Sequence, residues 1–426
     1  MGTPRRPAGL SHRARIVGVV LALALQAALL WIDYRPAQRG LVGDETIYLE
    51  TARDVREGRG TRSEALRPPF YSYLLAALDA RPGNRLAIQI VQMAALLVAA
   101  LALRSLTLHL GGTERAGDLA ALALLLCPTL GAFAHYIWPE ILHLALWVGA
   151  LAILAGERRS VPRLLLAGVL LAVAVLLRHL LLVFVPLVAL VVWLEARETP
   201  GRSRSALVAP LALLIPVLLL VAPAVWADWS HDGRLRSTSN VRFNLWVGLN
   251  DQSRKSLDEP IVFEEYKTYM SSADAAIERD EILEARIGDL AAEEGWPTLL
   301  ARQLGRQYFR LFDKDTFFTE QLPGGALHGE RRGYRLAPGV AAELLRWLDY
   351  VVYGGLLALA ARGLAACRPR GSRWLQLILV FLAYNLAIFL LLHVKSRYRV
   401  QLTPFLILFA ASGLDQVLGG ARRMAP

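Results

Sequence analysis

Cysteine and lysine are scarce in this chain of 426 residues, and charged residues of all kinds make up only 19% of it. With two cysteines, Cys127 in an apolar segment and Cys367 in a basic loop, the chain has no CxxC metal or redox motif and no expected disulfide. The low charged fraction excludes an ordinary soluble protein of this length. Lysine occurs at four positions, so arginine supplies nearly all of the positive charge, a composition typical of a GC-rich bacterium.

Long apolar blocks take the place of charge, since hydrophobic residues make up 55% of the chain. An apolar block of about 20 residues crosses the hydrocarbon core of a bilayer as one helix. The sequence therefore predicts an all-α polytopic membrane protein with about ten transmembrane helices. They are expected at residues 16–32, 86–103, 118–136, 138–155, 162–178, 179–194, 206–226, 342–361, 374–392 and 400–418. The first block is too long for a signal-peptide core and is expected to be retained.

Arginine-rich connections predict the orientation of these helices. Short basic loops remain on the cytoplasmic side of a membrane. In the ten-helix arrangement they all fall on one side, at residues 1–15, 104–117, 156–163, 195–205, 362–373 and 419–426. We expect a multi-pass protein of the bacterial inner membrane with both termini in the cytoplasm. The net charge of +11 then reflects this bias and does not indicate nucleic-acid binding.

Two long hydrophilic segments would face the outside. The chain thus divides into an N-terminal transmembrane module (1–226) with a first outer loop (33–85), a mixed extracytoplasmic domain (227–341) and C-terminal transmembrane helices (342–426). Apolar spacing predicts two interfacial helices in the first loop, at 44–58 and 69–80. Segment 296–312 spaces three arginines four residues apart, which suits either a helix resting on anionic head groups or a packed helix with a solvated basic face.

Polar groups at the outer ends of the spans are the candidates for chemistry, because ionisable residues near hydrocarbon are costly and usually functional. Four sets meet on the predicted outer side, and the cytoplasmic side has no comparable mixture of acids, histidines and aromatic residues. They are Asp44 and Glu45 with Arg67; the turn His135, Tyr136, Trp138 and Glu140; the pair Arg178 and His179; and the run Lys395, Arg397, Tyr398 and Arg399.

Each set also has a simpler explanation. Asp44 or Glu45 could stabilise a helix N-terminus, and Glu140 could do so after Pro139. The step Pro68-Pro69 could only begin a helix. Arg178 and Arg399 could be anchors that reach lipid phosphates. The shared side and the order of the four sets favour a functional site.

A lipid-linked phosphate ester would suit such a site. Cations stabilise the charge that develops on a departing phosphate, and Arg67, Arg178, Lys395, Arg397 and Arg399 could provide them. A carboxylate can accept the proton of an incoming hydroxyl or amine. One base without a nucleophilic carboxylate predicts a single displacement with inversion. The aromatic residues Tyr48, Tyr71, Tyr136 and Trp138 suit packing against sugar or prenyl groups, although interfacial belts contain the same residues.

The whole pattern resembles the GT-C superfamily of integral-membrane glycosyltransferases, in the branch of the protein O-mannosyltransferases and lipid A aminoarabinose transferases. The residues that match are Asp44-Glu45-Thr46 with Tyr48, Arg67-Pro68-Pro69, Trp138-Pro139-Glu140, the segment Asn244 to Asn250, and Ser396-Arg397-Tyr398-Arg399 with Pro404. These short motifs occur in the family's order along almost the whole chain.

The resemblance implies a polyprenyl-phosphate sugar donor, transfer with inversion at the outer face, Asp44 as the catalytic acid with Glu45 beside it, and Arg67 at the donor phosphate. It also implies substrate contacts by Asn244, Asn250 and Tyr398. One departure is Ile47, which stands where aminoarabinose transferases have a phosphate-binding arginine. No cofactor is required. Asp44, Glu45 and Glu140 could ligate a divalent cation, but no spacing demands one. The acceptor is left open.

Two other functions fit a protein of this class. A transporter or flippase for lipid-linked sugars would favour charged or broken helices near the bilayer midplane and paired repeats, and the sequence shows no repeat. A scaffold for envelope assembly would tolerate changes at Asp44, Arg67 and Glu140, whereas an enzyme would lose turnover with Asp44→Asn.

Overall fold

The computed structural model describes residues 9–33, 41, 44–60, 69–156, 160–198, 205–232, 236–250, 260–269, 273–306, 308–312, 340–367 and 372–419. Within these ranges every regular element is a helix, and the one β-type pairing is an isolated bridge between Arg81 and Asn84. The prediction of an all-α chain is confirmed for this part of the protein. Arg67 lies outside it.

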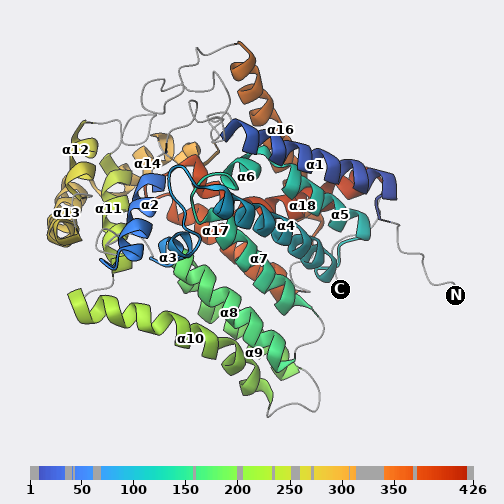
Figure 1. Ribbon diagram of the computed structural model, residues 1–426, viewed down its shortest axis with the longest axis horizontal. Helices are drawn as coiled ribbons and strands as arrows, with labels where there is room; N and C mark the ends of the chain where they lie inside the picture. Colours follow the sequence, from blue (N-terminus) through green and yellow to red (C-terminus); the bar gives the residue numbers. More distant parts are fainter. Residues whose placement is uncertain are drawn as a thin grey trace.

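A helical bundle forms the body of the molecule (Figure 1). Its helices are α1 (His12–Asp33), α4 (Leu86–His109), α5 (Glu114–Leu126), α6 (Pro128–Phe133), α7 (Glu140–Ala155), α8 (Val161–Leu177), α9 (Phe184–Glu198), α10 (Ser205–Asp232), α16 (Val340–Ala366), α17 (Arg373–Ile388) and α18 (Thr403–Val417). Helix α4 packs against α5 and α7, α8 against α7 and α10, and α18 against α16 and α5. One apolar core runs through these contacts.

Four helical stretches are long and apolar enough to cross a membrane: His12–Trp31, Leu86–His109, His179–Glu198 and Ala206–Trp226. Shorter apolar helices lie at Glu140–Ala155, Val161–Leu177, Tyr350–Ala366, Arg373–Ile388 and Thr403–Val417. Each predicted span except 118–136 overlaps one of these stretches. That all of them cross the bilayer stays a prediction.

The predicted span 118–136 is wrong as a single helix. It is divided between α5, which ends at Leu126, and α6, which begins at Pro128. Cys127 between them has extended backbone angles (φ −66°, ψ 110°). A proline disfavours the helical conformation of the residue before it, so the apolar run could not continue as one helix.

Two short helices follow α1 where the sequence predicts them. Helix α2 spans Asp44–Arg56 and α3 spans Phe70–Ala77, and the two pack against each other. Gly58 and Gly60, with φ of +73° and +76°, make the turn after α2, a conformation that costs glycine little. The helices themselves are confirmed, whereas their position in a membrane interface stays a prediction.

A second, smaller core joins the helices between α10 and α16. They are α11 (Arg236–Asn250), α12 (Pro260–Tyr269), α13 (Ala273–Glu294) and α14 (Trp296–Arg306), followed by the 3-10 turn η2 (Tyr308–Phe312). Phe243, Trp246, Leu283 and Leu299 lie in this core. We call α11 to α14 the cap.

Neither interpretation of segment 296–312 holds for Arg302, because this arginine is bound within the cap. Its guanidinium donates to both carboxylate oxygens of Glu294, at 2.8 and 3.0 Å, and to the Leu249 carbonyl at 3.0 Å. Arg302 therefore joins α14 to α11. It does not form part of a free basic face.

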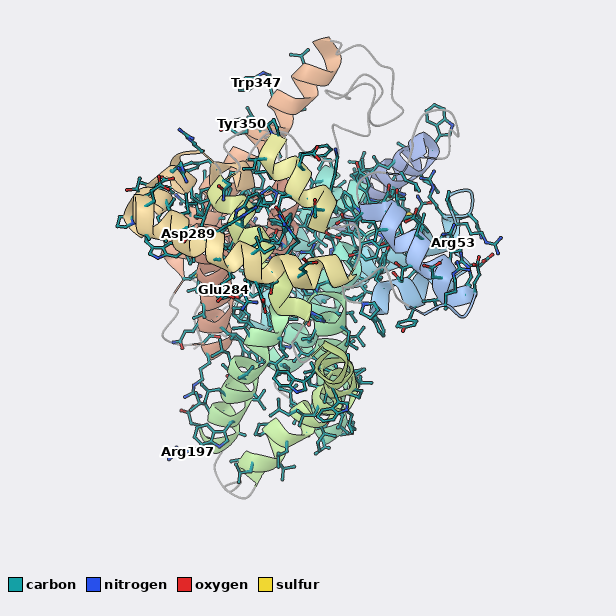
Figure 2. The ribbon with its side chains drawn as sticks, turned by 90° about the vertical axis from the view of Figure 1, so that its left-hand side faces the viewer. Arg53, Arg197, Glu284, Asp289, Trp347 and Tyr350 are labelled. Atoms are coloured by element: carbon teal, nitrogen blue, oxygen red, sulfur yellow. The ribbon has the colours of Figure 1, made fainter. Side chains whose placement is uncertain are left out.

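The bundle has two distinct ends (Figure 1). Helices α2 and α3 and the cap gather at one end, which we call the α2 end. The beginnings of α1 and α5 and the end of α18 lie at the other, which we call the α5 end. Viewed towards the α2 end, α13 with Glu284 and Asp289 lies on one side and α2 with Arg53 on the other (Figure 2).

Candidate active site

The first two residues of α2 have different surroundings. Both are acids in the first helical turn, where the helix dipole favours negative charge. The Glu45 side chain is fully buried, and its Oε1 accepts a hydrogen bond from the Ile137 backbone N–H at 2.8 Å. Glu45 thereby fixes α2 to the turn that precedes α7. Asp44, in contrast, retains partial exposure.

Asp44 forms an ion pair with Arg397, a residue 353 positions away in the sequence. The Arg397 Nη1 lies 2.8 Å from Asp44 Oδ2, and the two side chains are 16% and 15% exposed. The guanidinium carbon also lies 5.4 Å from the ring centre of Trp138 and 5.5 Å from that of Tyr398. Arg397 belongs to the 3-10 turn η4 (Ser396–Gln401) between α17 and α18.

Arg397 stays protonated in this position. Burial alone would lower its pKa, but the negative charge of Asp44 raises that pKa well above the usual value, and Tyr398 and Glu140 add to the effect. A permanent cation with aromatic rings nearby is therefore held against a carboxylate.

A second ion pair belongs to the same site. Arg178 Nη2 lies 2.5 Å from Glu140 Oε1, and Glu140 is 4% exposed. Glu140 begins α7 after Pro139, and Arg178 ends α8 in an extended conformation (φ −149°, ψ 106°). The break at Arg178 confirms the predicted division of 162–194 into two segments. The Glu140 Oε2 is buried without a hydrogen-bond partner among the described residues.

Three amides that the sequence analysis missed support the turn beneath these pairs. Gln92 Nε2 donates to the Tyr136 carbonyl at 2.7 Å, and Gln89 Nε2 donates to the His135 carbonyl at 3.1 Å. The His135 Nε2 lies 3.1 Å from Gln26 Oε1. Polar side chains in otherwise apolar helices were the available signal, because buried amides need hydrogen-bond partners.

The four aromatic residues predicted to pack against sugar or prenyl groups lie inside the molecule and contact one another in pairs. Tyr136 stacks on Trp138 at 4.5 Å between ring centres, and Tyr48 meets Tyr71 edge to face at 5.1 Å. All four side chains are at most 6% exposed. Burial raises the pKa of Tyr71 well above its usual value, with the charges of Tyr48, Glu140 and Glu45 adding, so its hydroxyl stays protonated. It donates to Gln92 Oε1 at 2.8 Å.

The remaining residues predicted in the run 395–399 lie on or beside η4. Lys395 directly precedes the turn and is half-buried. Tyr398 stacks on Phe389 at 5.2 Å. Arg399 is 3% exposed, with its guanidinium carbon 4.5 Å from the ring centre of Tyr353 in α16. Of these, Tyr398 adjoins the Asp44–Arg397 pair through its ring.

Asn244 and Asn250 have contacts of a different kind. The Asn244 carbonyl accepts from the His393 N–H at 2.8 Å, and the Asn250 side chain donates to the Trp246 carbonyl in its own helix at 2.8 Å. The Asn244 bond fastens α11 to the segment before η4, whereas the Asn250 bond lies within α11. His179 begins the 3-10 turn η1 (His179–Val183) directly after Arg178.

Metal ligands do not gather in the described part of the chain. Within it, no three side chains of His, Cys, Asp or Glu lie close enough together to hold a metal ion. Asp44, Glu45 and Glu140 accordingly form no such group. The expectation that a divalent cation could bind there is supported only by the residue types.

Comparisons with known proteins bear on this fold. No protein-family model and no curated protein sequence matches the chain. The structure is similar to that of the oligosaccharyltransferase of Archaeoglobus fulgidus in its apo form, with a TM-score of 0.53, 14% identity, and coverage of 96% of this chain and 51% of the other. The complex of that enzyme with zinc and sulfate has a TM-score of 0.50 and 14% identity, with coverage of 95% of this chain and 49% of the other.

The similarity to ArnT from Cupriavidus metallidurans bound to undecaprenyl phosphate is weaker, with a TM-score of 0.40 at 15% identity over 97% of this chain and 80% of that one. A score this low carries no argument. The chain spans about half the length of the archaeal enzyme. At such low identity the likeness is one of fold.

Proposed function

We propose that this chain, which has the fold of the GT-C superfamily of membrane glycosyltransferases, is itself an inverting glycosyltransferase. It would move a sugar from a polyprenyl-phosphate donor to an acceptor at the outer face of the membrane. The donor class follows the family resemblance of the motifs and the cations of the site. The sugar and the acceptor are left open.

One observation carries this proposal: the contact between Asp44 and Arg397 at 2.8 Å. It joins the two motifs that lie farthest apart among those resembling the family. An acid and a permanent cation in contact are the pair that the chemistry requires, because the reaction needs a base for the acceptor and positive charge for the departing phosphate.

The reaction would be a single displacement. The acceptor hydroxyl or amine attacks the anomeric carbon of the sugar while the bond from that carbon to the phosphate oxygen breaks. Asp44 accepts the proton of the acceptor, and polyprenyl phosphate leaves with the bonding electrons. Attack from the face opposite the phosphate inverts the anomeric centre, as expected when no second carboxylate acts as a nucleophile.

The other charged residues receive supporting roles. Arg397 would hold the donor phosphate, with Arg178, Lys395, Arg399 and Arg67 as further cations along its path. Glu45 would position α2 through its bond to Ile137. Trp138 and Tyr398 beside Arg397 would orient the guanidinium.

The α2 end would face the outside. This orientation is supported by the positive-inside rule, which places arginine-rich connections in the cytoplasm, because the connection 104–117 lies at the α5 end. In this orientation α2 and α3 would lie in the outer interface and the bundle would cross the bilayer about ten times. A reporter fused after Gly419 is expected to be active on the cytoplasmic side only.

The decisive experiment measures donor consumption in nanodiscs with a panel of polyprenyl-phosphate sugars. We expect Asp44→Asn to reduce the release of polyprenyl phosphate by about 10²- to 10⁴-fold, the usual contribution of a general base. The matched control is Asp54→Asn, a change of the same kind on the same helix at a residue that pairs with Arg59. It should retain wild-type release.

Equal turnover by Asp44→Asn and wild type would exclude Asp44 as the base. If folded wild-type protein released nothing from any donor, the glycosyltransferase proposal would give way to transport or scaffolding.

A further inference from the structure

The segment between α17 and η4 is held by the cap. Gln303, in α14, is 2% exposed, and its Nε2 donates to the Leu392 carbonyl at 2.8 Å and to the Phe389 carbonyl at 3.4 Å. Both carbonyls belong to residues beyond α17, which ends at Ile388. A buried amide that meets both of them fixes the path of the chain as it leaves the helix.

Helix α11 also binds this segment, through its backbone. The His393 N–H donates to the Asn244 carbonyl at 2.8 Å. A Cβ on Gly248 would lie 2.5 Å from the Leu391 carbonyl oxygen and 2.9 Å from the His393 nitrogen. Only glycine permits so close an approach of the two backbones. Two helices of the cap thus contact four of the five residues 389–393.

A short series of contacts joins this segment to the candidate site. The Phe389 ring stacks on Tyr398, with 5.2 Å between centres and 2° between planes. The Tyr398 ring lies 5.5 Å from the guanidinium of Arg397, which pairs with Asp44. Coupling between distant groups requires such a contiguous set of packed side chains and hydrogen bonds.

We propose that Gln303 is a positioning residue of the active site: through Phe389 and Tyr398 it holds Arg397 where the guanidinium meets Asp44 and the donor phosphate. This inference rests on the proposed function. It makes the cap a part of the phosphate site. It also assigns the Asn244–Asn250 segment a supporting role at that site.

The test measures binding of undecaprenyl phosphate to the full chain in nanodiscs, together with thermal stability. We expect Gln303→Met, which keeps the volume and removes the donor, to weaken binding about fivefold to tenfold. Phe389→Leu removes the ring between the cap and Tyr398 and should weaken binding similarly. The control Thr298→Met, at an exposed position of α14, should bind as wild type does.

A double-mutant cycle separates positioning from a general loss of structure. If Gln303 acts through Arg397, then Gln303→Met should have no further effect on binding in an Arg397→Ala background, because coupled residues are not additive. A purely structural residue would lower stability and leave the affinity of the folded protein unchanged. If Gln303→Met does not fold, Phe389→Leu in the same cycle decides.

The outcomes distinguish the inference from the proposed function. Weak binding by Arg397→Ala with normal binding by Gln303→Met and Phe389→Leu would overturn the inference alone. Additive effects in the cycle would overturn it too. Normal binding by Arg397→Ala would show that Arg397 does not hold the phosphate and would overturn the inference. The proposed function is tested separately, by donor release in Asp44→Asn.

Discussion

Both ends of the bundle contain buried pairs of a carboxylate and an arginine, but these pairs differ in how completely their hydrogen bonds are satisfied. At the α5 end, Asp118 accepts hydrogen bonds from Arg104 at 2.8 Å and from the Leu10 N–H at 3.0 Å, and Arg15 lies 3.0 Å away. Asp415 accepts from Arg115 and, at 2.9 Å, from the Thr113 hydroxyl. These two carboxylates join α1, α4, α5 and α18, and each has partners from more than one direction.

At the α2 end the corresponding groups keep binding capacity. In the described part of the chain, the Glu140 Oε2 and the Arg397 Nε are buried without hydrogen-bond partners. Buried polar groups are nearly always satisfied, so each exception calls for an explanation. A ligand that supplies the missing partners is the explanation that we favour. At these two ends, the fully satisfied carboxylates join helices, whereas the incompletely satisfied Glu140 lies in the candidate site.

Removing the cation of the α2 end should have the largest effect on activity among the arginine changes. We expect Arg397→Ala to lower turnover of the polyprenyl-phosphate donor by about 10²- to 10³-fold, the range found when a donor to developing negative charge is lost. Steady-state rates in nanodiscs measure this. Arg115→Ala at the α5 end is the matched control, with rates expressed per folded protein because this change leaves the buried Asp415 without its partner. Equal losses in the two variants would show that the two ends do not differ in function.

Removing a carboxylate of the α5 end should instead destabilise the fold. Asp415→Ala would leave Arg115 and Thr113 without their partner, and losing the partner of such groups costs about 1–3 kcal/mol of unfolding free energy. Thermal unfolding in detergent would detect the loss. Undecaprenyl phosphate should bind the folded variant as tightly as wild type, and weaker binding would contradict a purely structural role.

The cap provides a smaller test of the same rule. Glu265 accepts hydrogen bonds from Arg279 at 2.7 Å and Arg286 at 3.0 Å. Burial alone would raise the pKa of Glu265, but these two arginines lower it below the usual 4.5. Its stabilising contribution is therefore complete above pH 4.5 and is lost as the pH falls through the lower pKa of the folded state.

Protection factors for hydrogen exchange in α12 and α13, which are corrected for the intrinsic pH dependence of amide exchange, should accordingly fall at acidic pH in wild type. Glu265→Gln has no carboxylate to protonate, so this part of the pH dependence should disappear in the variant. An unchanged pH profile would show that Glu265 contributes no stability to the cap.

Sequence reasoning predicted the helices well where apolar residues run without interruption. It failed at 118–136, where hydropathy alone predicts one helix but Pro128 prevents Cys127 from adopting the helical conformation. It also anticipated that Asp44, Glu140, Arg178 and Arg397 would meet, since alternating spans return to the same side of a membrane. Arg67, the predicted phosphate ligand of the first loop, lies outside the described residues.

The pairing of those groups could not be predicted. Hydropathy shows on which side of the membrane a residue lies but not which neighbour it contacts. The sequence analysis did not identify the glutamines at 26, 89, 92 and 303 for the same reason. The role of an amide in an apolar helix can be inferred only when its hydrogen-bond partners are known.

The sequence by itself determined the helical class, the approximate limits of most helices and the set of polar residues gathered at one end. Apolar runs and arginine placement are local properties, and each depends on how a segment interacts with water and lipid, not on its packing partners. Only the tertiary structure decided that Asp44 faces Arg397, that Glu45 is a buried joint, and that the cap holds the segment before η4. Those contacts join residues dozens to hundreds of positions apart. Their geometry depends on how whole helices pack, which no local pattern specifies.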